Sequence, residues 1–170
     1  MKITNEQIQI WIEDYLAKGY GEKVKNRKIS DILVHKLRKE NYTGFAEKAS
    51  DRWNKKIEEN IEELKQIASF DELLNRIEML RITGIGELSV YDTATCIGNE
   101  RDVYPQYVYM HAGTVVGAAA IGVKGKKIAK EVFVEKFSAF NVLEPIQIED
   151  FLCIYKSRLQ GDVESNISCC

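Results

Sequence analysis

The sequence predicts a mostly α-helical fold, and three observations support this prediction. Apolar residues recur mostly at intervals of three and four rather than in alternation. Only two prolines, Pro105 and Pro145, interrupt the 170 residues, and proline is a strong helix breaker. A chain of this length can form one substantial core and is short for two. We therefore expect a single-domain helical bundle over residues 1–160, followed by a flexible tail over 161–170.

Three helices are predicted in the first part of the chain. One runs over 5–18, beginning at Asn5 as a capping residue and ending before Gly19. A second begins near Ser30. A long third helix over 43–68 carries an apolar stripe on one face and glutamates on the other, which should face solvent. The stripe consists of Phe45, Ala49, Trp53, Ile57, Ile61, Leu64 and Ile67.

The rest of the chain is also predicted to be helical, apart from one connector. A helix capped by Asp71 and another that begins after Gly86 form a hairpin over 71–98. Residues 103–110 favour β structure but are too isolated for a sheet, so we expect an extended connector. Helices should then follow over about 112–121, 126–137 and 148–159. The predicted core includes Trp11, Trp53, Ile57, Ile61, Leu80, Ile85 and Ile97.

Composition restricts the functions that this chain can serve. Its net charge is −2, so any contact with nucleic acid must come from a local basic patch. No apolar run reaches the roughly 18 residues of a membrane span, and residues 1–6 lack the apolar core of a secretion signal. We therefore expect a cytoplasmic protein with no membrane partner. The four cysteines lack metal-ligand spacing, so we expect reduced thiols, no metal and no cofactor.

The segment Thr83-Gly84-Ile85-Gly86 is the most informative part of the sequence. Two glycines separated by one apolar residue allow a sharp turn between helices, with Ile85 inside the hairpin and the amides of the next helix pointing outward. Such amides suit a DNA phosphate. The alternative is an ordinary helix connection in which the glycines serve only as cap and spacer. Glu87 favours that alternative, because its carboxylate competes with a phosphate for the same amides.

A basic run near the N-terminus could supply the local charge that DNA binding needs. Little acid interrupts this run, which consists of Lys18, Lys23, Lys25, Arg27, Lys28, Lys36, Arg38 and Lys39. The members that we expect to contact DNA are Lys23, Lys25, Arg27 and Lys28. They could extend the phosphate contact of the hairpin, although a charge run can equally be a solvated surface. The pair Lys126-Lys127 would be a second, smaller phosphate contact.

His111 and the tyrosines before it form a second candidate site. Tyr104, Tyr107 and Tyr109 precede a helix rich in glycine and alanine, whose small side chains leave room for a ligand or for a closely packed helix. Tyr107 and Tyr109 could line a pocket with His111 and stack a base. The alternative is a histidine that caps or braces a tightly packed helix, beside half-buried tyrosines.

From residue 71 to 123 the order of elements resembles the helix-hairpin-helix superfamily of base-excision DNA glycosylases. The features that carry the resemblance are the hairpin with Thr83-Gly84-Ile85-Gly86, a proline-containing connector and a helix that opens Met110-His111-Ala112-Gly113. The resemblance places the catalytic aspartate of the family on His111, and the lysine nucleophile of its bifunctional members on Leu88 or Ser89. The chain also cannot build the four-cysteine iron–sulfur loop that such enzymes often carry.

These observations predict a helix-hairpin-helix DNA-binding protein that is DNA glycosylase-like, with or without glycosylase activity. DNA would be contacted through its backbone. In an enzyme, His111 or Asp92 would activate water for hydrolysis of an N-glycosidic bond. Asp150 is explained more simply as an acid at the start of a helix. The alternative function is a non-enzymatic protein-interaction module that uses the hairpin only for packing, with a protein partner.

Overall fold

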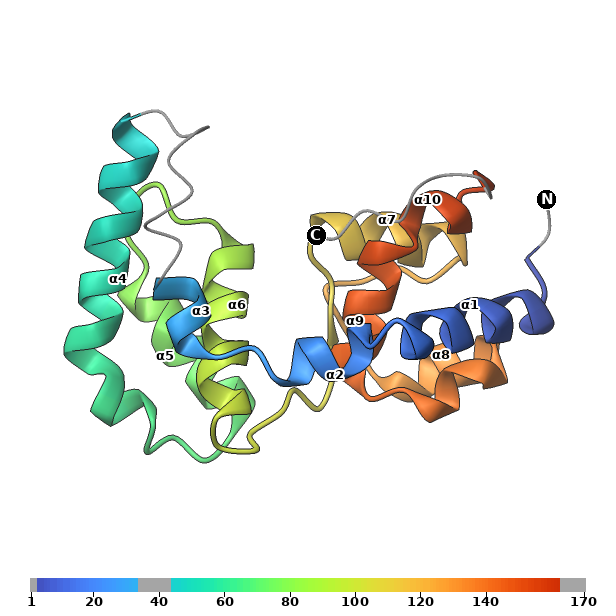
Figure 1. Cartoon of the computed structure of the whole chain (residues 1–170), viewed down its shortest axis with the longest axis horizontal. Helices are drawn as coiled ribbons and strands as arrows, with labels where there is room; N and C mark the ends of the chain where they lie inside the picture. Colours follow the sequence, from blue (N-terminus) through green and yellow to red (C-terminus); the bar gives the residue numbers. More distant parts are fainter. Residues whose placement is uncertain (1–2, 34–43, 163–170) are drawn as a thin grey trace. The chain divides into compact units, whose positions relative to one another are not determined.

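The computed structural model describes residues 3–33 and 44–162, and these residues are mostly helical (Figure 1). The predicted mostly α fold is therefore confirmed. The tail predicted over 161–170 lies outside the described residues except for its first two. The elements are α1 (Asn5–Ala17), α2 (Tyr20–Lys25), α3 (Ile29–Leu33), α4 (Gly44–Leu64), α5 (Phe70–Leu80), α6 (Glu87–Asn99), β1 (Val108–Tyr109), α7 (Ala112–Ala120), β2 (Lys127–Ile128), α8 (Lys130–Lys136), the 3-10 helix η2 (Ser138–Val142), α9 (Pro145–Ile154) and α10 (Lys156–Leu159).

Backbone contacts divide the chain into two compact units. We call residues 26–33 and 44–105 the inserted unit, and residues 3–25 with 106–162 the terminal unit. The chain passes from one unit to the other twice, after Lys25 and after Pro105. Both units bury apolar side chains.

In the inserted unit, α5 packs against both α4 and α6 (Figure 1). The apolar stripe of α4 faces inward as predicted, since Ala49, Trp53, Ile57 and Leu64 are buried, although Ile61 is only half-buried. The glutamates Glu58, Glu59, Glu62 and Glu63 are exposed, also as predicted. Ser69 caps α5 in place of Asp71, because its hydroxyl oxygen accepts a hydrogen bond from the amide of Glu72 at 3.2 Å.

The terminal unit is built around α9, of which residues 146–154 are all buried. Helix α7 packs on α9 at very short range: a Cβ atom on Gly117 would collide with the carbonyl oxygen of Leu152. Only glycine permits this approach. Phe151 also belongs to a cluster of ring contacts with Tyr15, Phe140 and Tyr155.

Three details of the first helices differ from the prediction. The Thr4 hydroxyl, rather than Asn5, caps α1 by accepting a hydrogen bond from the amide of Gln7 at 3.2 Å. The chain does turn at Gly19, which has a φ of +71°, but it continues directly into α2. Gly21 lies inside α2, and its carbonyl oxygen accepts a hydrogen bond from the Gln147 amide at 3.3 Å. Gly21 is thus a packing position, because a side chain there would meet α9.

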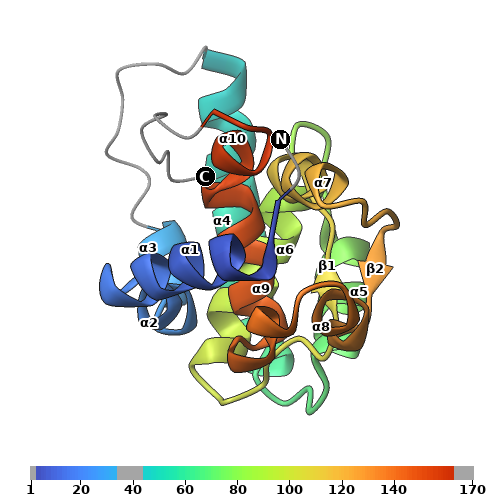
Figure 2. The ribbon, with the colours of Figure 1, turned by 90° about the vertical axis from the view of Figure 1, so that its right-hand side faces the viewer.

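The helix predicted over 126–137 is shorter than expected and is preceded by a strand. Lys127 and Ile128 form β2, which pairs antiparallel with β1, and α8 begins only at Lys130. The connector predicted over 103–110 therefore takes part in a two-stranded ribbon (Figure 2). The turn before β2 includes Gly125 at a φ of +146°, a conformation that suits glycine and breaks a helix. No sheet of three or more strands occurs in the described residues, as predicted.

Helix α9 begins at Pro145 rather than at residue 148. Pro145 occupies the first helical position, where proline is favoured, and the side chains of Glu144 and Gln147 form a capping box. No helix in the described part of the chain is both long enough and apolar enough to cross a membrane.

Candidate nucleic-acid interface

The predicted hairpin turn joins α5 to α6 through residues 81–86, which we call the hairpin turn. Gly84 has a φ of +96°, a backbone conformation that residues other than glycine rarely adopt. The turn is closed by a hydrogen bond of 3.1 Å from the amide of Ile85 to the carbonyl oxygen of Ile82. Gly86 is extended, with φ −86° and ψ 166°, and is the N-cap residue of α6.

The first amides of α6 are accessible. Gly84, Gly86, Glu87, Leu88 and Ser89 are all exposed, and no side chain of the described residues caps this helix. The first amides of an α-helix have no partner within the helix, so these point to solvent. A Cβ atom on Gly86 would have no described heavy atom within 4 Å, which leaves room for a ligand atom.

Ile85 is less buried than predicted for a residue that fills the interior of the hairpin. Ile85 is half-buried, whereas Leu80 and Ile97 are buried as predicted, as are Trp11, Trp53 and Ile57. Ile85 is flanked by two exposed glycines, which supply no apolar atoms to cover it. The interior of the hairpin is filled mainly by buried residues of the helices themselves, including Leu73, Ile77, Val90 and Ala94.

The predicted basic run is divided between the units and partly neutralised. Lys23 and Lys25 belong to α2 of the terminal unit, and the Lys25 ammonium lies 3.2 Å from the Glu144 carboxylate. Arg27 and Lys28 belong to the inserted unit. The paired charge of Lys25 is less available to a phosphate, whereas the side chains of Lys23 and Lys28 are exposed.

Asp92, a predicted catalytic residue, forms an ion pair with a predicted DNA-binding residue. Its carboxylate oxygen lies 3.6 Å from the Arg27 guanidinium, and both side chains are about one-third exposed. The pair joins α6 to the segment before α3, so it has a clear structural role. It also lowers the positive charge that Arg27 offers to a ligand.

His111, Tyr107 and Tyr109 belong to the terminal unit, whereas the hairpin turn and Asp92 belong to the inserted unit. His111 is the N-cap residue of α7 through its backbone, and its carbonyl oxygen accepts a hydrogen bond of 2.7 Å from the amide of Val115. Lys127 contacts both tyrosines, since its ammonium lies 4.4 Å and 5.5 Å from the ring centroids of Tyr107 and Tyr109.

A buried polar pair that the sequence pattern did not predict joins α7 to α9. The Thr114 hydroxyl donates a hydrogen bond of 2.7 Å to a carboxylate oxygen of Glu149, and both side chains are buried. The next residue, Asp150, is also buried and accepts a hydrogen bond of 3.0 Å from the Tyr15 hydroxyl. Asp150 therefore anchors α9 to α1 rather than acting as an exposed N-terminal acid. The signal that could have found this pair is a carboxylate within a continuous apolar run.

The cysteines offer no reactive nucleophile in the described residues. Burial raises the pKa of the Cys96 thiol to about 12, so the thiolate is absent at neutral pH. Cys153 is disulfide-bonded, so the expectation of reduced thiols is wrong for this residue.

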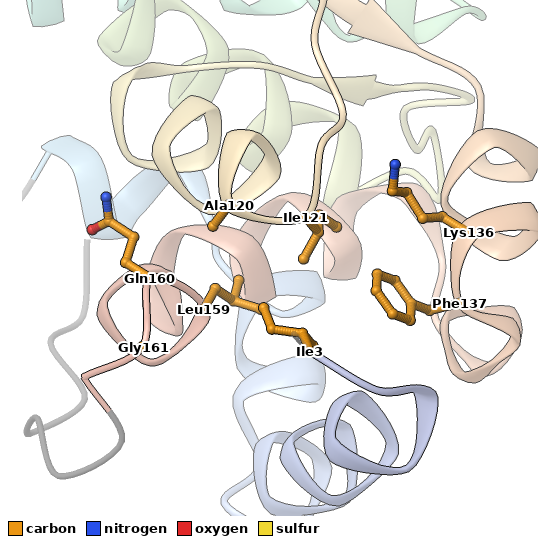
Figure 3. A pocket seen from close by; sticks show the side chains of 8 residues that line it. All are labelled: Ile3, Ala120, Ile121, Lys136, Phe137, Leu159, Gln160 and Gly161. Atoms are coloured by element: carbon orange, nitrogen blue, oxygen red, sulfur yellow. The ribbon is translucent and has the colours of Figure 1, made fainter. Parts of the chain in front are cut away.

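A cleft in the terminal unit contains none of the predicted site residues. It has a volume of about 540 Å³, and its side chains come from the chain near α1 and from the ends of α7, α8 and α10 (Figure 3). Its lining is mostly apolar, with Lys136 and Gln160 as the polar side chains: Ile3, Ala120, Ile121, Lys136, Phe137, Leu159, Gln160 and Gly161. With neither a carboxylate nor a histidine, it does not resemble a hydrolytic site.

Comparison with known proteins adds no assignment. No protein-family model, curated protein or solved structure matches the chain. Among the residues that the structure describes, no group of three or more histidine, cysteine or acidic side chains could hold a metal ion.

Proposed function

We propose that this protein binds DNA through the hairpin turn and is related in architecture to helix-hairpin-helix DNA glycosylases. The observation that carries the proposal is the exposed, uncapped start of α6 behind two exposed glycines. This proposal is for binding to the DNA backbone, and it assigns no turnover to the chain.

The chemistry of the hairpin turn suits a phosphate group. Unpaired amides at a helix start carry partial positive charge, equivalent to roughly half an elementary charge, and they point along the direction from which an anion approaches. Because the space around Gly86 is open, a phosphate oxygen can reach the amides directly. Because the contact uses backbone atoms, it is independent of base sequence.

A second candidate function is a protein-interaction module, and two side chains favour it. Leu88 is 45% exposed beside the hairpin turn, where an apolar partner could cover it. Glu87 adds an exposed negative charge next to the amides. A protein partner would contact the side chains of Leu88 and Glu87, whereas DNA would contact the backbone amides of α6.

Substituting Gly86 tests the proposal without disturbing the fold. In the Gly86→Asp variant, the new carboxylate can cap the amides of α6, because the backbone of Gly86 is already extended and open space surrounds it. We expect thermal stability to be unchanged or higher, and the affinity for labelled duplex DNA to fall at least severalfold. Fluorescence anisotropy measures the affinity.

Gly86→Ala is the matched control, since it adds a methyl group in open space and leaves the amides available. It should bind DNA as the wild type does. Equal DNA affinity of the Gly86→Asp variant and the wild type, or no DNA binding by the wild type, would contradict the proposal. In either case, the protein-interaction function becomes the better explanation of the turn.

A further inference from the structure

The β1–β2 ribbon of the terminal unit has one buried face and one accessible face. Val108 pairs with Ile128 and is fully buried. Tyr109 pairs with Lys127, and adjacent residues of a strand point to opposite sides. Tyr109 and Lys127 therefore lie on the outer face. Tyr107 lies on the same side, because the Lys127 ammonium is over its ring.

The ribbon and its turn carry concentrated positive charge. Between Asp102 and Glu131 the chain has no acidic residue. Lys124, Lys126 and Lys127 are all exposed, and they flank Gly125 in the turn that enters β2. Neither Lys124 nor Lys126 forms an ion pair with any residue that the structure describes.

This surface is a better source of positive charge than the basic run near the N-terminus. There, Lys25 and Arg27 lie next to the carboxylates of Glu144 and Asp92. Charge held by a neighbouring carboxylate contributes less to the attraction of a polyanion, whereas solvated lysines can exchange their counterions for phosphates. The lysines of the ribbon turn meet this condition.

The tyrosines add a second type of contact. Lys127 lies above the Tyr107 ring, which is 39% exposed. An unpaired base can stack on the face of an exposed tyrosine ring that the lysine does not cover, and the lysine over the other face can neutralise the adjoining phosphate. In duplex DNA the bases are already stacked on each other, so this combination favours an unpaired strand.

We infer that the β1–β2 ribbon binds a single-stranded segment of DNA, with Lys124 and Lys126 on phosphates and Tyr107 stacked on a base. The inference rests on the proposed function only in taking DNA as the ligand. It concerns a different surface from the hairpin turn, in the other unit, and uses side chains rather than amides.

The lysines are tested by the salt dependence of binding. We would titrate a short fluorescein-labelled oligothymidylate with the full chain at several salt concentrations and follow the anisotropy. For single strands each phosphate contact contributes about 0.7 to the slope of log affinity against log salt. The Lys124→Ala/Lys126→Ala double variant should therefore lose about 1.4 from this slope. The matched control Lys23→Ala/Lys25→Ala removes the same charge from α2 and should lose less.

Tyr107 is tested by two substitutions that differ in their ability to stack. Tyr107→Leu should weaken binding of the oligothymidylate by about fivefold or more, since a stacked base contributes at least that much. Tyr107→Phe keeps the ring and should bind as the wild type does. Binding of a fully paired duplex should be nearly equal in all three proteins. Thermal melting verifies that each variant is folded.

The results separate this inference from the proposed function. Unchanged oligothymidylate binding by the ribbon variants, together with weaker duplex binding by Gly86→Asp, would overturn the inference and leave the hairpin proposal intact. A larger effect of the α2 control pair than of the ribbon pair would also overturn it. If the wild type binds neither probe, both proposals are wrong.

Discussion

Two glycines, one in each unit, serve opposite purposes. In the terminal unit, Gly117 lets the backbones of α7 and α9 touch, and no Cβ atom would fit between them. In the inserted unit, Gly86 precedes α6 in open space, where a Cβ atom would have no described heavy atom within 4 Å. A glycine in a sequence can thus mark either a closed contact or an accessible backbone. The surroundings decide which, and substitution can measure the difference.

The largest effect should come from adding one methyl group at each of these positions. Gly117→Ala forces α7 away from the Leu152 carbonyl, and we expect a loss of about 3 kcal/mol or more in the free energy of unfolding, at the upper end for overpacking. Gly86→Ala should change it by less than about 0.5 kcal/mol, as at most exposed positions. Urea denaturation of the two variants and the wild type gives these values.

A Gly117→Ala protein as stable as the wild type would show that the two helices separate easily. The contrast between a closed contact and an open turn would then be lost.

A second comparison uses two buried threonines, one in each unit. The Thr114 hydroxyl donates to Glu149, whereas the Thr95 hydroxyl is buried without a hydrogen-bond partner among the described residues. Thr114→Val removes a donor from a buried carboxylate and should cost about 1–3 kcal/mol. Thr95→Val replaces an unsatisfied hydroxyl with a methyl group of similar size and should be neutral or stabilising. Both are measured by denaturant unfolding.

Equal losses in the two valine variants would mean that the Thr114–Glu149 hydrogen bond contributes no more than the shape of the side chain. The polar pair between α7 and α9 would then be incidental to the packing.

The smallest effect is a pH dependence that arises in the terminal unit. Burial opposes ionisation of Asp14, but hydrogen bonds from Lys18 and from the Tyr155 hydroxyl outweigh it and lower the pKa of this carboxyl. Because the pKa is lower in the folded than in the unfolded state, the stabilisation is present above the ordinary value of 3.8 and is lost as the pH falls through the folded pKa.

Asp14→Asn should therefore be less stable than the wild type at pH 6, by a few tenths of a kcal/mol, and the difference should shrink near pH 3. Thermal melting at the two pH values measures it. A difference that stays constant with pH would indicate that the carboxylate charge of Asp14 contributes nothing to stability.

Helical periodicity predicted most of the fold because most helices have one buried and one exposed face. The long helix α4 is the clearest example, with its apolar stripe inside and its glutamates outside. Helix α9 has no such contrast: residues 146–154 are buried all round and include Gln147, Glu149 and Asp150. All three have hydrogen-bond partners in distant segments of the chain. The spacing of apolar residues along the sequence contains no information about these partners, so it predicts that the polar residues face solvent.

The same distinction separates the predicted parts of the candidate site from the missed parts. The turn at Gly84 and Gly86 follows from local backbone chemistry, which four residues already specify. The partial neutralisation of the basic run could not be foreseen, because Glu144 approaches Lys25 only after the chain has returned from the inserted unit. The ribbon was missed as a strand pair because each of its strands is only two residues long.

The insertion of one unit within the other also sets an order for biosynthesis. A ribosome releases residues 26–105 as one continuous stretch, so the inserted unit has its whole sequence before the terminal unit does. Helix α1 is translated before the inserted unit, yet its apolar residues Ile8 and Trp11 share a core with residues of α9, which is translated after that unit. Until α9 is translated, the apolar face of α1 therefore lacks these core partners and is accessible to a chaperone.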